Sequence, residues 1–157
     1  MDPTTHLPGS RALRRGRHSR PGGIYLVTTT TRSREPVFLD FRHACAAAAV
    51  ITDRHSLGDS QLLAWVLMPD HLHMLLQIGK FEPMPRVVGR IKSRSATAVK
   101  RASRRDIPVW FGGYHDRAIR QQEDIRRAAR YIVANPVRAG LVQRCEDYPF
   151  WDAIWLP

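Results

Sequence analysis

The sequence predicts an α+β domain: an antiparallel sheet with helices packed on one face, followed by a further helix near the C-terminus. Three observations predict this class. Apolar runs of strand length alternate with amphipathic stretches of helix length along the chain. The chain has 157 residues, which is enough for one domain with its own core. Its residues are 43% hydrophobic and 25% charged, an ordinary composition for a globular domain.

The first strand and the first helix are predicted between residues 24 and 55. Residues 24–31 follow a pair of glycines and are rich in β-branched and aromatic side chains, which is typical of a strand. Residues 40–55 carry apolar side chains at helical spacing, and Gly58 follows them. Asp40 is a suitable N-terminal cap for this helix.

Two neighbouring strands are predicted at residues 61–68 and 71–78. Both runs are apolar, QLLAWVLM and HLHMLLQI, and Pro69 and Asp70 separate them. We expect the two strands to pair antiparallel, with two histidines at the start of the second.

The second half of the chain predicts a basic helix, a short strand and a last helix. Residues 84–105 contain eight basic residues and no acid, with apolar residues along one side. Residues 106–113 fit a short strand or extended segment. Residues 121–134 fit a helix that ends at Asn135 and Pro136, because a residue before proline avoids helical geometry.

This order of elements resembles the split βαβ arrangement of ferredoxin-like domains. We expect one domain over residues 22–157, including an apolar C-terminal tail that docks onto it. Residues 1–21 hold five arginines among proline, glycine, serine and threonine, without an apolar period. They predict a flexible basic arm.

The charge of the chain indicates a polyanionic partner. Its 25 Lys and Arg residues against 14 Asp and Glu give a net charge of +11, and most of these cations are arginine. An arginine fork fits phosphate oxygens in pairs, which favours nucleic acid, although an anionic membrane surface also attracts cations. No apolar run approaches the roughly 20 residues of a membrane span, and no apolar signal segment begins the chain. We therefore expect a soluble cytoplasmic protein, in which Cys45 and Cys145 are buried and unpaired.

His71 and His73 are the sharpest candidates for metal ligands. On a strand, residues two apart point to the same face, so both imidazoles can reach one ion while Leu72 faces the other side. Imidazole pairs suit divalent metals, and a third oxygen or amide donor would leave room for a phosphate oxygen. Two half-exposed strand histidines without a ligand are the alternative, because this motif alone is not a closed ligand set.

Tyr131 is the candidate nucleophile on the last predicted helix. Asn135 follows about one turn later, so the phenol and the amide share a face if the helix extends that far. A tyrosine can attack a metal-bound phosphate, and Asn135 can supply a third ligand. The alternative is a half-buried tyrosine with a local hydrogen bond, followed by an asparagine that only ends the helix.

Longer strings connect these residues to a known family. WVLMPDHLHMLL resembles the His-hydrophobic-His signature of single-tyrosine HUH transposases. GGYHDRAIRQQEDIRRAARYIVANPVRAGLV resembles the tyrosine helix of their REP-associated branch, and GGIYLVTTTT and VFLD resemble the family's first strand and helix entrance. The resemblance covers roughly residues 22–151 with the motifs in order, which is far more specific than a histidine pair alone.

The resemblance implies a ferredoxin-like catalytic domain that nicks and joins single-stranded DNA beside hairpins. It implies His71 and His73 as ligands of Mg²⁺ or Mn²⁺, with Asn135 as a further ligand, and Tyr131 as the nucleophile of a 5′-phosphotyrosine intermediate. It implies no membrane and no small-molecule cofactor, an action at the nucleoid in the cytoplasm, and either a monomer or a homodimer. Asp70 departs from the family, in which asparagine commonly precedes the first histidine; a carboxylate there can orient an imidazole or shift the metal preference.

The candidate DNA contacts are basic residues outside this constellation. They lie on the predicted helix at 84–105 and in the N-terminal arm: Arg86, Arg90, Lys92, Arg94, Lys100, Arg101, Arg104, Arg105, Arg14 and Arg15. For each of them, a solvated basic face without a ligand is the alternative. Trp110, Phe111 and Tyr114 can stack on unpaired bases or pack in the core.

Two other functions stay open on the sequence alone. A non-catalytic module derived from a transposase would hold structured DNA or RNA on the same basic surface. A metal-dependent hydrolase of small phosphate esters would leave Tyr131 with a structural role. The net charge disfavours the hydrolase, because a small substrate does not need basic residues spread over a helix and an arm.

Overall fold

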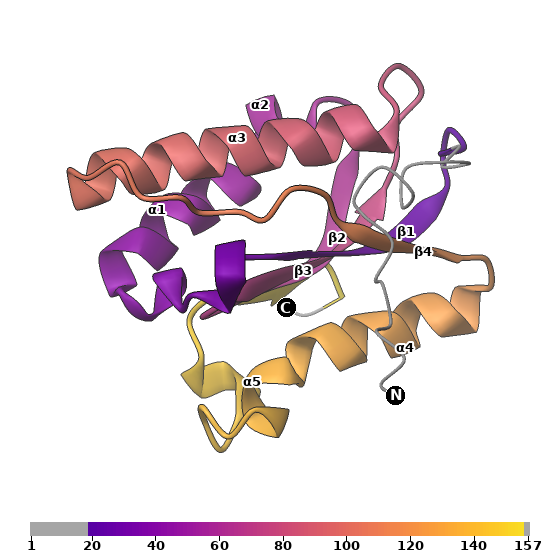
Figure 1. Ribbon diagram of the computed structural model, residues 1–157. Helices are drawn as coiled ribbons and strands as arrows, with labels where there is room; N and C mark the ends of the chain where they lie inside the picture. The colour runs from indigo at the N-terminus through magenta and orange to yellow at the C-terminus, as the bar shows by residue number, and fades with distance from the viewer. Residues whose placement is uncertain (1–18, 156–157) are drawn as a thin grey trace, which may run out of the picture.

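Five strands form one antiparallel sheet with helices on both of its faces (Figure 1). The computed structural model describes residues 19–155. The strands lie in the order β4-β1-β3-β2-β5, and each neighbouring pair is antiparallel. The strands are β1 (Ile24–Thr30), β2 (Gln61–Met68), β3 (His71–Gln77), β4 (His115–Ile119) and β5 (Trp151–Ala153). The helices are α1 (Phe41–Ile51), α2 (Arg54–Leu57), α3 (Met84–Ser103), α4 (Gln122–Val133) and α5 (Asn135–Arg138), with short 3-10 turns at Arg32–Arg34, Val37–Leu39 and Cys145–Asp147.

The first four strands have the order of a ferredoxin-like sheet, with β1 and β3 at its centre. The α+β prediction is therefore confirmed. The first three strands begin where they were predicted and end within one residue of the prediction, and the helices predicted at 84–105 and 121–134 are present as α3 and α4. In the described part of the chain, no helix is both long and apolar enough to cross a membrane.

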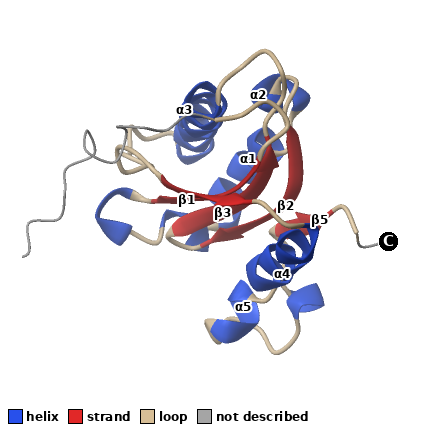
Figure 2. Ribbon diagram, turned by 90° about the vertical axis from the view of Figure 1, so that its right-hand side faces the viewer, coloured by secondary structure: helices blue, strands red, loops and turns tan. Residues whose placement is uncertain are grey.

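The sheet separates two apolar cores (Figure 2). Helices α1, α2 and α3 cover one face, and α4 and α5 lie on the other. Strand β3 serves both cores, since Leu72 and Met74 pack with α1 and α3 while Leu75 packs with α4. Because side chains alternate along a strand, His71 and His73 point to the α4 side.

Truncating Leu72 is expected to destabilise the fold strongly. Its side chain is completely buried between the sheet and the α1 and α3 helices. Leu72→Ala removes apolar contacts and leaves a cavity, so the free energy of unfolding should fall by about 2–5 kcal/mol in urea denaturation. Leu39→Ala is the matched control, because Leu39 is 66% exposed. An equal loss in both variants would contradict this packing.

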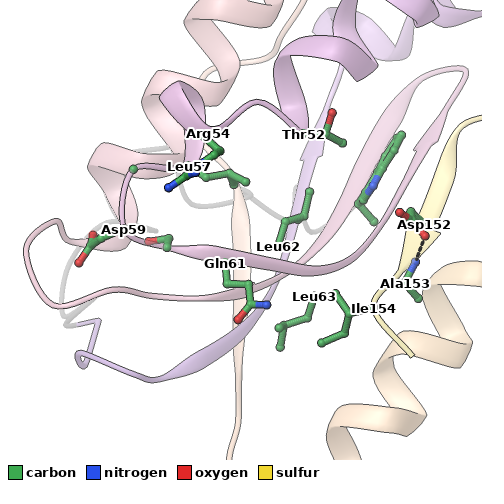
Figure 3. A pocket seen from close by; sticks show the side chains of 13 residues that line it. Thr52, Arg54, Leu57, Asp59, Gln61, Leu62, Leu63, Asp152, Ala153 and Ile154 are labelled. Atoms are coloured by element: carbon green, nitrogen blue, oxygen red, sulfur yellow. Dashed lines mark hydrogen bonds between the residues drawn. The ribbon is translucent and has the colours of Figure 1, made fainter. Parts of the chain in front are cut away.

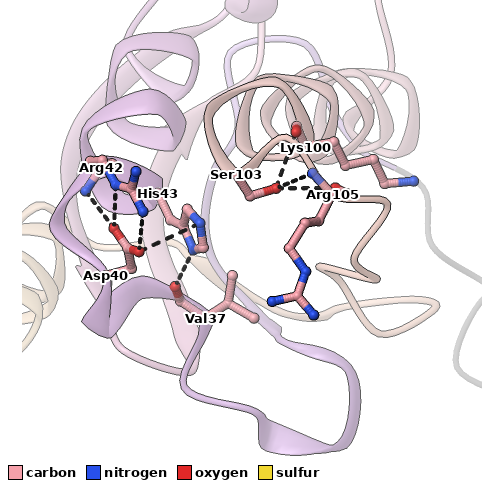
Figure 4. Close-up of polar contacts among 7 residues, drawn as sticks. All are labelled: Val37, Asp40, Arg42, His43, Lys100, Ser103 and Arg105. Atoms are coloured by element: carbon pink, nitrogen blue, oxygen red, sulfur yellow. Dashed lines mark hydrogen bonds and ion pairs between the residues drawn. The ribbon is translucent and has the colours of Figure 1, made fainter.

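Local hydrogen bonds fix the ends of the helices on the α1 and α3 face (Figure 4). Asp40 caps α1 as predicted, since its Oδ1 accepts a 2.9 Å hydrogen bond from the backbone N–H of Arg42. The helix ends at Ile51, earlier than predicted, and the separate helix α2 follows it. After α3, the Ser103 hydroxyl accepts a 3.2 Å hydrogen bond from the backbone N–H of Arg105.

The fourth strand lies later in the chain than predicted. Of the two alternatives predicted for residues 106–113, a short strand or an extended segment, the strand is absent, and within this segment only Trp110 forms a β-bridge, to Thr31. The strand is β4, whose sequence HDRAI pairs with β1 so that His115 lies opposite Thr28. Because this strand is polar, it does not form an apolar run in the sequence. A polar composition suits an edge strand, where charged side chains discourage pairing with other chains.

The C-terminal tail docks on the sheet as predicted, and it also contributes a strand. Trp151–Ala153 pairs with β2 as the edge strand β5, which was not predicted. The prediction that both cysteines are buried is wrong. On α1, Ala44 and Ala47 point into the apolar core, so Cys45 between them points outward and is exposed. Cys145 is half-buried in a 3-10 turn.

Two residues before the predicted domain boundary at residue 22 make contacts with the folded part of the chain. The Ser19 hydroxyl accepts a 2.9 Å hydrogen bond from the backbone N–H of Met84 at the start of α3. The backbone N–H of Arg20 donates to the Tyr25 hydroxyl at 2.9 Å. The rest of the predicted arm, with Arg14 and Arg15, lies outside the described residues.

Candidate active site

The two candidate metal ligands lie side by side on the sheet face that α4 covers. His71 and His73 are alternate residues of β3, and their ring centroids are 4.8 Å apart. On the neighbouring strand β1, they lie opposite Thr30 and Thr28. The prediction that both imidazoles share one face is confirmed.

Each imidazole has a hydrogen-bond partner at Nδ1. The His71 Nδ1–H donates to the Asp70 carboxylate at 2.7 Å, and the other oxygen of Asp70 accepts from Arg34 Nε at 3.0 Å. His73 Nδ1 lies 2.7 Å from the Thr28 hydroxyl. When the Nδ1–H of each ring donates in this way, the lone pairs of both Nε2 atoms are free for a metal ion.

Tyr131 brings a phenol to the same place from a distant part of the chain. Ala128, Ala129 and Ile132 form the buried stripe of α4 against the sheet, and Tyr131 lies at its border. The Tyr131 ring centroid is 6.0 Å from that of His73, and the tyrosine is 46% exposed. The phenol therefore lies outside the packed core, beside the histidines and open to a bound molecule.

Arg138 completes this side of the site. Its guanidinium carbon lies 3.8 Å from the centroid of the Tyr131 ring, a cation–π contact that holds the ring in place. Arg138 belongs to α5, and Pro136 lies in the first turn of this helix, where its missing N–H costs no intrahelical hydrogen bond. The site thus contains a fixed positive charge beside the phenol.

Asn135 lies at the junction between α4 and α5. Its side chain is buried, and its amide nitrogen donates to the Tyr131 carbonyl at 3.1 Å. This bond fixes the amide close to the nucleophile and leaves its oxygen as an acceptor. The role of Asn135 as a metal ligand stays a prediction.

The donor atoms fit a divalent cation. Partial burial, together with the smaller effects of the charges of His71, Arg138 and Arg34, lowers the pKa of His73 to about 4. His73 is therefore neutral at pH 7 and has a lone pair to offer. Within residues 19–155 no group of three His, Cys, Asp or Glu side chains is placed to hold a metal ion, so further donors would be an amide such as that of Asn135, water or the substrate.

The metal-free protein is expected to lose stability in mild acid because of His73. Its pKa of about 4 in the fold lies below its ordinary value of 6.5, so protonation favours the unfolded chain. The stability that neutral His73 contributes is fully present above the pKa of the unfolded chain, and it is lost as the pH falls toward the pKa in the fold. From about pH 7 to about pH 5 the free energy of unfolding should fall by about 2 kcal/mol through this group. Urea denaturation measures this, His73→Gln should remove that part of the slope, and a slope unchanged by the substitution would contradict it.

The predicted basic stripe lies on the other side of the sheet. Helix α3 packs into the core opposite the histidines. Four of its cations have intramolecular partners: Arg90 with Glu82, Lys92 with the Phe111 and Gly113 carbonyls, Arg94 with Asp53, and Lys100 with Asp106. The other four are exposed: Arg86, Arg101, Arg104 and Arg105. Their contact with DNA stays a prediction, and it would lie away from the candidate chemistry.

Of the three aromatic residues predicted to stack on bases, two pack against the core and one is exposed. The Trp110 indole N–H donates to the Ser95 hydroxyl at 2.9 Å, and its ring packs on Phe38, so it belongs to the core. Tyr114 is half-buried against the same core. Phe111 alone of the three is mostly exposed.

Three residues of the site were missed in the sequence. Thr28 and Arg34 reach it through contacts between distant segments, for which the sequence contains no local signal. Arg138 did have one, since it follows Tyr131 by seven residues, or two helical turns.

A hollow of about 510 Å³ between α2, β2 and β5 is not part of this site (Figure 3). Arg54, Gln61 and Asp152 are among its lining residues. Gln61 begins β2, whereas Met68, opposite His71, ends it. At the rise of a strand this separation is about 20 Å.

Comparison with known proteins identifies the family. A family model described as "Transposase IS200 like" matches residues 22–135. The REP-associated tyrosine transposase of Escherichia coli (strain K12) is 26% identical over 133 residues, which cover 82% of this chain and 75% of the relative. A Haemophilus influenzae relative assigned to the same class is 24% identical over 140 residues, covering 82% of this chain and 78% of the relative.

A solved structure has the same fold. The REP-associated tyrosine transposase bound to a REP hairpin aligns with a TM-score of 0.67 at 24% identity, covering 86% of this chain and 79% of that one. The segment matched by the family model contains the sheet from β1 to β4, both histidines and Tyr131. The chain therefore belongs to the IS200-like transposase family.

Proposed function

We propose that this chain nicks and rejoins single-stranded DNA beside hairpins through a covalent tyrosine intermediate. The observation that carries the proposal is the convergence of His73 and Tyr131, whose rings lie 6.0 Å apart although they come from β3 and α4. A tyrosine with only a structural role does not need to be half exposed beside two imidazoles. Membership of a transposase family supports the same class of reaction.

The proposed step is a transesterification that conserves the energy of the phosphodiester bond. The Tyr131 oxygen attacks the phosphorus in line and forms a 5′-phosphotyrosine, and the phenol proton passes to solvent. The bond to the 3′-oxygen breaks, and this oxygen takes up a proton and leaves as a hydroxyl. A second 3′-hydroxyl then attacks the phosphotyrosine, releases Tyr131 and rejoins the strands. Arg138 orients the phenol and adds positive charge where the phosphate binds.

The residues that would hold Mg²⁺ or Mn²⁺ are His71, His73 and Asn135. When bound, such a cation withdraws charge from the scissile phosphate. Asp70 and Thr28 orient the two imidazoles through Nδ1, and Arg34 in turn orients Asp70. The carboxylate at position 70 thus acts on the metal site through His71.

The proposed substrate is a single strand next to a hairpin. The solved relative is bound to a REP hairpin, and the Escherichia coli relative is named as REP-associated. The net charge of +11 suits such a polyanion. The proposed activity belongs to the cytoplasm, at the nucleoid, and uses no small-molecule cofactor.

Labelled oligonucleotides drawn from palindromes beside the coding gene test this proposal. With Mg²⁺ or Mn²⁺ we expect a protein–DNA adduct that survives denaturing electrophoresis, and EDTA should prevent its formation. Salt-sensitive binding that ignores EDTA, without an adduct, would support a non-catalytic DNA- or RNA-binding module instead. Preferential hydrolysis of small phosphate esters would support the hydrolase alternative.

A further inference from the structure

A second basic surface lies beside Tyr131 itself. A hollow of about 400 Å³ separates β4 from α4, within the roughly 300–1,000 Å³ of ligand pockets. Three arginines line it together with the candidate nucleophile. We call this surface the arginine cleft, and it is formed by Arg117, Arg120, Arg127 and Tyr131.

The position of the cleft follows from strand and helix phase. Arg117 lies opposite Leu26 of β1, and Leu26 packs against the α4 core. Because cross-strand partners share a face, Arg117 also points to the α4 side. On α4, Arg127 precedes Tyr131 by about one turn, so both side chains lie on one side of the helix. The candidate nucleophile Tyr131 is therefore one of the residues that line the cleft.

These arginines contribute little to the fold. Arg127 and Asp124 form a 3.5 Å ion pair at the surface, a type of pair worth at most about 1 kcal/mol. In the part of the chain that the structure describes, no carboxylate pairs with Arg117 or Arg120, and both are exposed. This differs from α3, where half of the basic stripe has internal partners. Gathering guanidinium groups in one hollow costs electrostatic free energy, which an anionic ligand would offset.

We propose that the arginine cleft binds the phosphate backbone of the single strand that flanks the scissile phosphate, an inference that rests on the proposed function. Guanidinium forks bind phosphate oxygens in pairs. The rest of the wall consists of Ala118, Ile119, Gln121, Asp124 and Ala128, so the arginines supply the phosphate contacts of the cleft. We assign the cleft to a single strand because the proposed reaction cuts a single strand.

Salt-dependent binding tests the cleft without any covalent step. Binding of labelled oligo(dT), which forms no hairpin, is followed by fluorescence anisotropy in a Tyr131→Phe background. The slope of log K against log salt is negative, and each lost phosphate contact reduces its magnitude by about 0.7 for a single strand. Arg117→Gln and Arg120→Gln should each show this loss, and the double variant about 1.4. Arg126→Gln is the matched control, since Arg126 is exposed on α4 but does not line the cleft, and its slope should not change.

Two outcomes would overturn the proposal. Slopes in both cleft variants that equal the slope of Arg126→Gln would exclude phosphate contacts in the cleft. Equal losses with blunt duplex DNA would exclude its assignment to a single strand. The test is separate from the chemistry: unchanged slopes with a normal wild-type adduct refute the cleft alone, and reduced slopes without any wild-type adduct refute the covalent reaction alone.

Discussion

Replacing Tyr131 with phenylalanine is expected to abolish covalent attachment of the protein to DNA. The ring contacts with His73 and Arg138 do not use the hydroxyl, so the fold and the surrounding site should persist. Loss of a nucleophile lowers the rate by about 10⁴-fold or more. Denaturing electrophoresis with a labelled hairpin oligonucleotide measures the adduct, and anisotropy should show that DNA binding is nearly unchanged.

Tyr148→Phe is the matched control for this experiment. The Tyr148 hydroxyl donates to the Leu67 carbonyl at 2.6 Å, and burial raises the pKa of Tyr148 to about 12. Removing that hydrogen bond should cost about 1 kcal/mol of stability and leave the adduct intact. An adduct at the wild-type level in Tyr131→Phe would refute the assignment of the nucleophile, and its loss in both variants would indicate a folding defect.

Much of the candidate site could be predicted because its residues follow the regular repeat of the strand or helix to which they belong. The alternation along β3 places His71 and His73 on one face, whatever the rest of the sheet does. The helical period of α4 buries Ala128 and Ile132 and leaves Tyr131 at the border of the buried face. Local patterns do not show that this helix covers the histidine face. That expectation came from the family resemblance.

Contacts between distant segments could not be predicted from the sequence. The bond between Thr28 and His73 depends on the register of β1 against β3, which the pairing of whole strands decides. Arg34, which forms an ion pair with Asp70, has a φ of 55°, a conformation that few non-glycine residues adopt. No sequence period encodes either contact.

The basic surfaces show the same limit for electrostatics. Residues 84–105, which contain α3, hold eight basic residues and no acid, which made this segment the leading DNA contact. The crossover places α3 on the face opposite the histidines, so DNA bound there would have to pass a sheet edge to reach Tyr131. The arginines of β4 and α4 are fewer and interrupted by acids, but they line a hollow that includes Tyr131. Distance from the reacting group, which the sequence does not contain, decides which set is relevant to the chemistry.

Replacing both histidines with alanine is expected to remove divalent metal binding and, with it, adduct formation. Loss of a group that merely orients a metal ligand typically lowers affinity by about 10–100-fold, and loss of the ligands themselves costs at least as much. Without the cation, the scissile phosphate keeps its full charge, so the rate should fall on the order of a thousand-fold. Titration with Mn²⁺, followed by electron paramagnetic resonance, measures binding independently of catalysis.

The paired substitution His71→Ala, His73→Ala should not unfold the protein, which makes its result interpretable. Both histidines are only partly buried, and neither belongs to the apolar cores. Removing His73 also removes a group whose protonation favours the unfolded chain, since its pKa in the fold is about 4. His55→Ala is the matched control, because His55 is exposed on α2 on the other side of the sheet. Unchanged Mn²⁺ affinity and an undiminished adduct in the double variant would show that the strand histidines hold no catalytic ion, and Tyr131 would then need another source of activation.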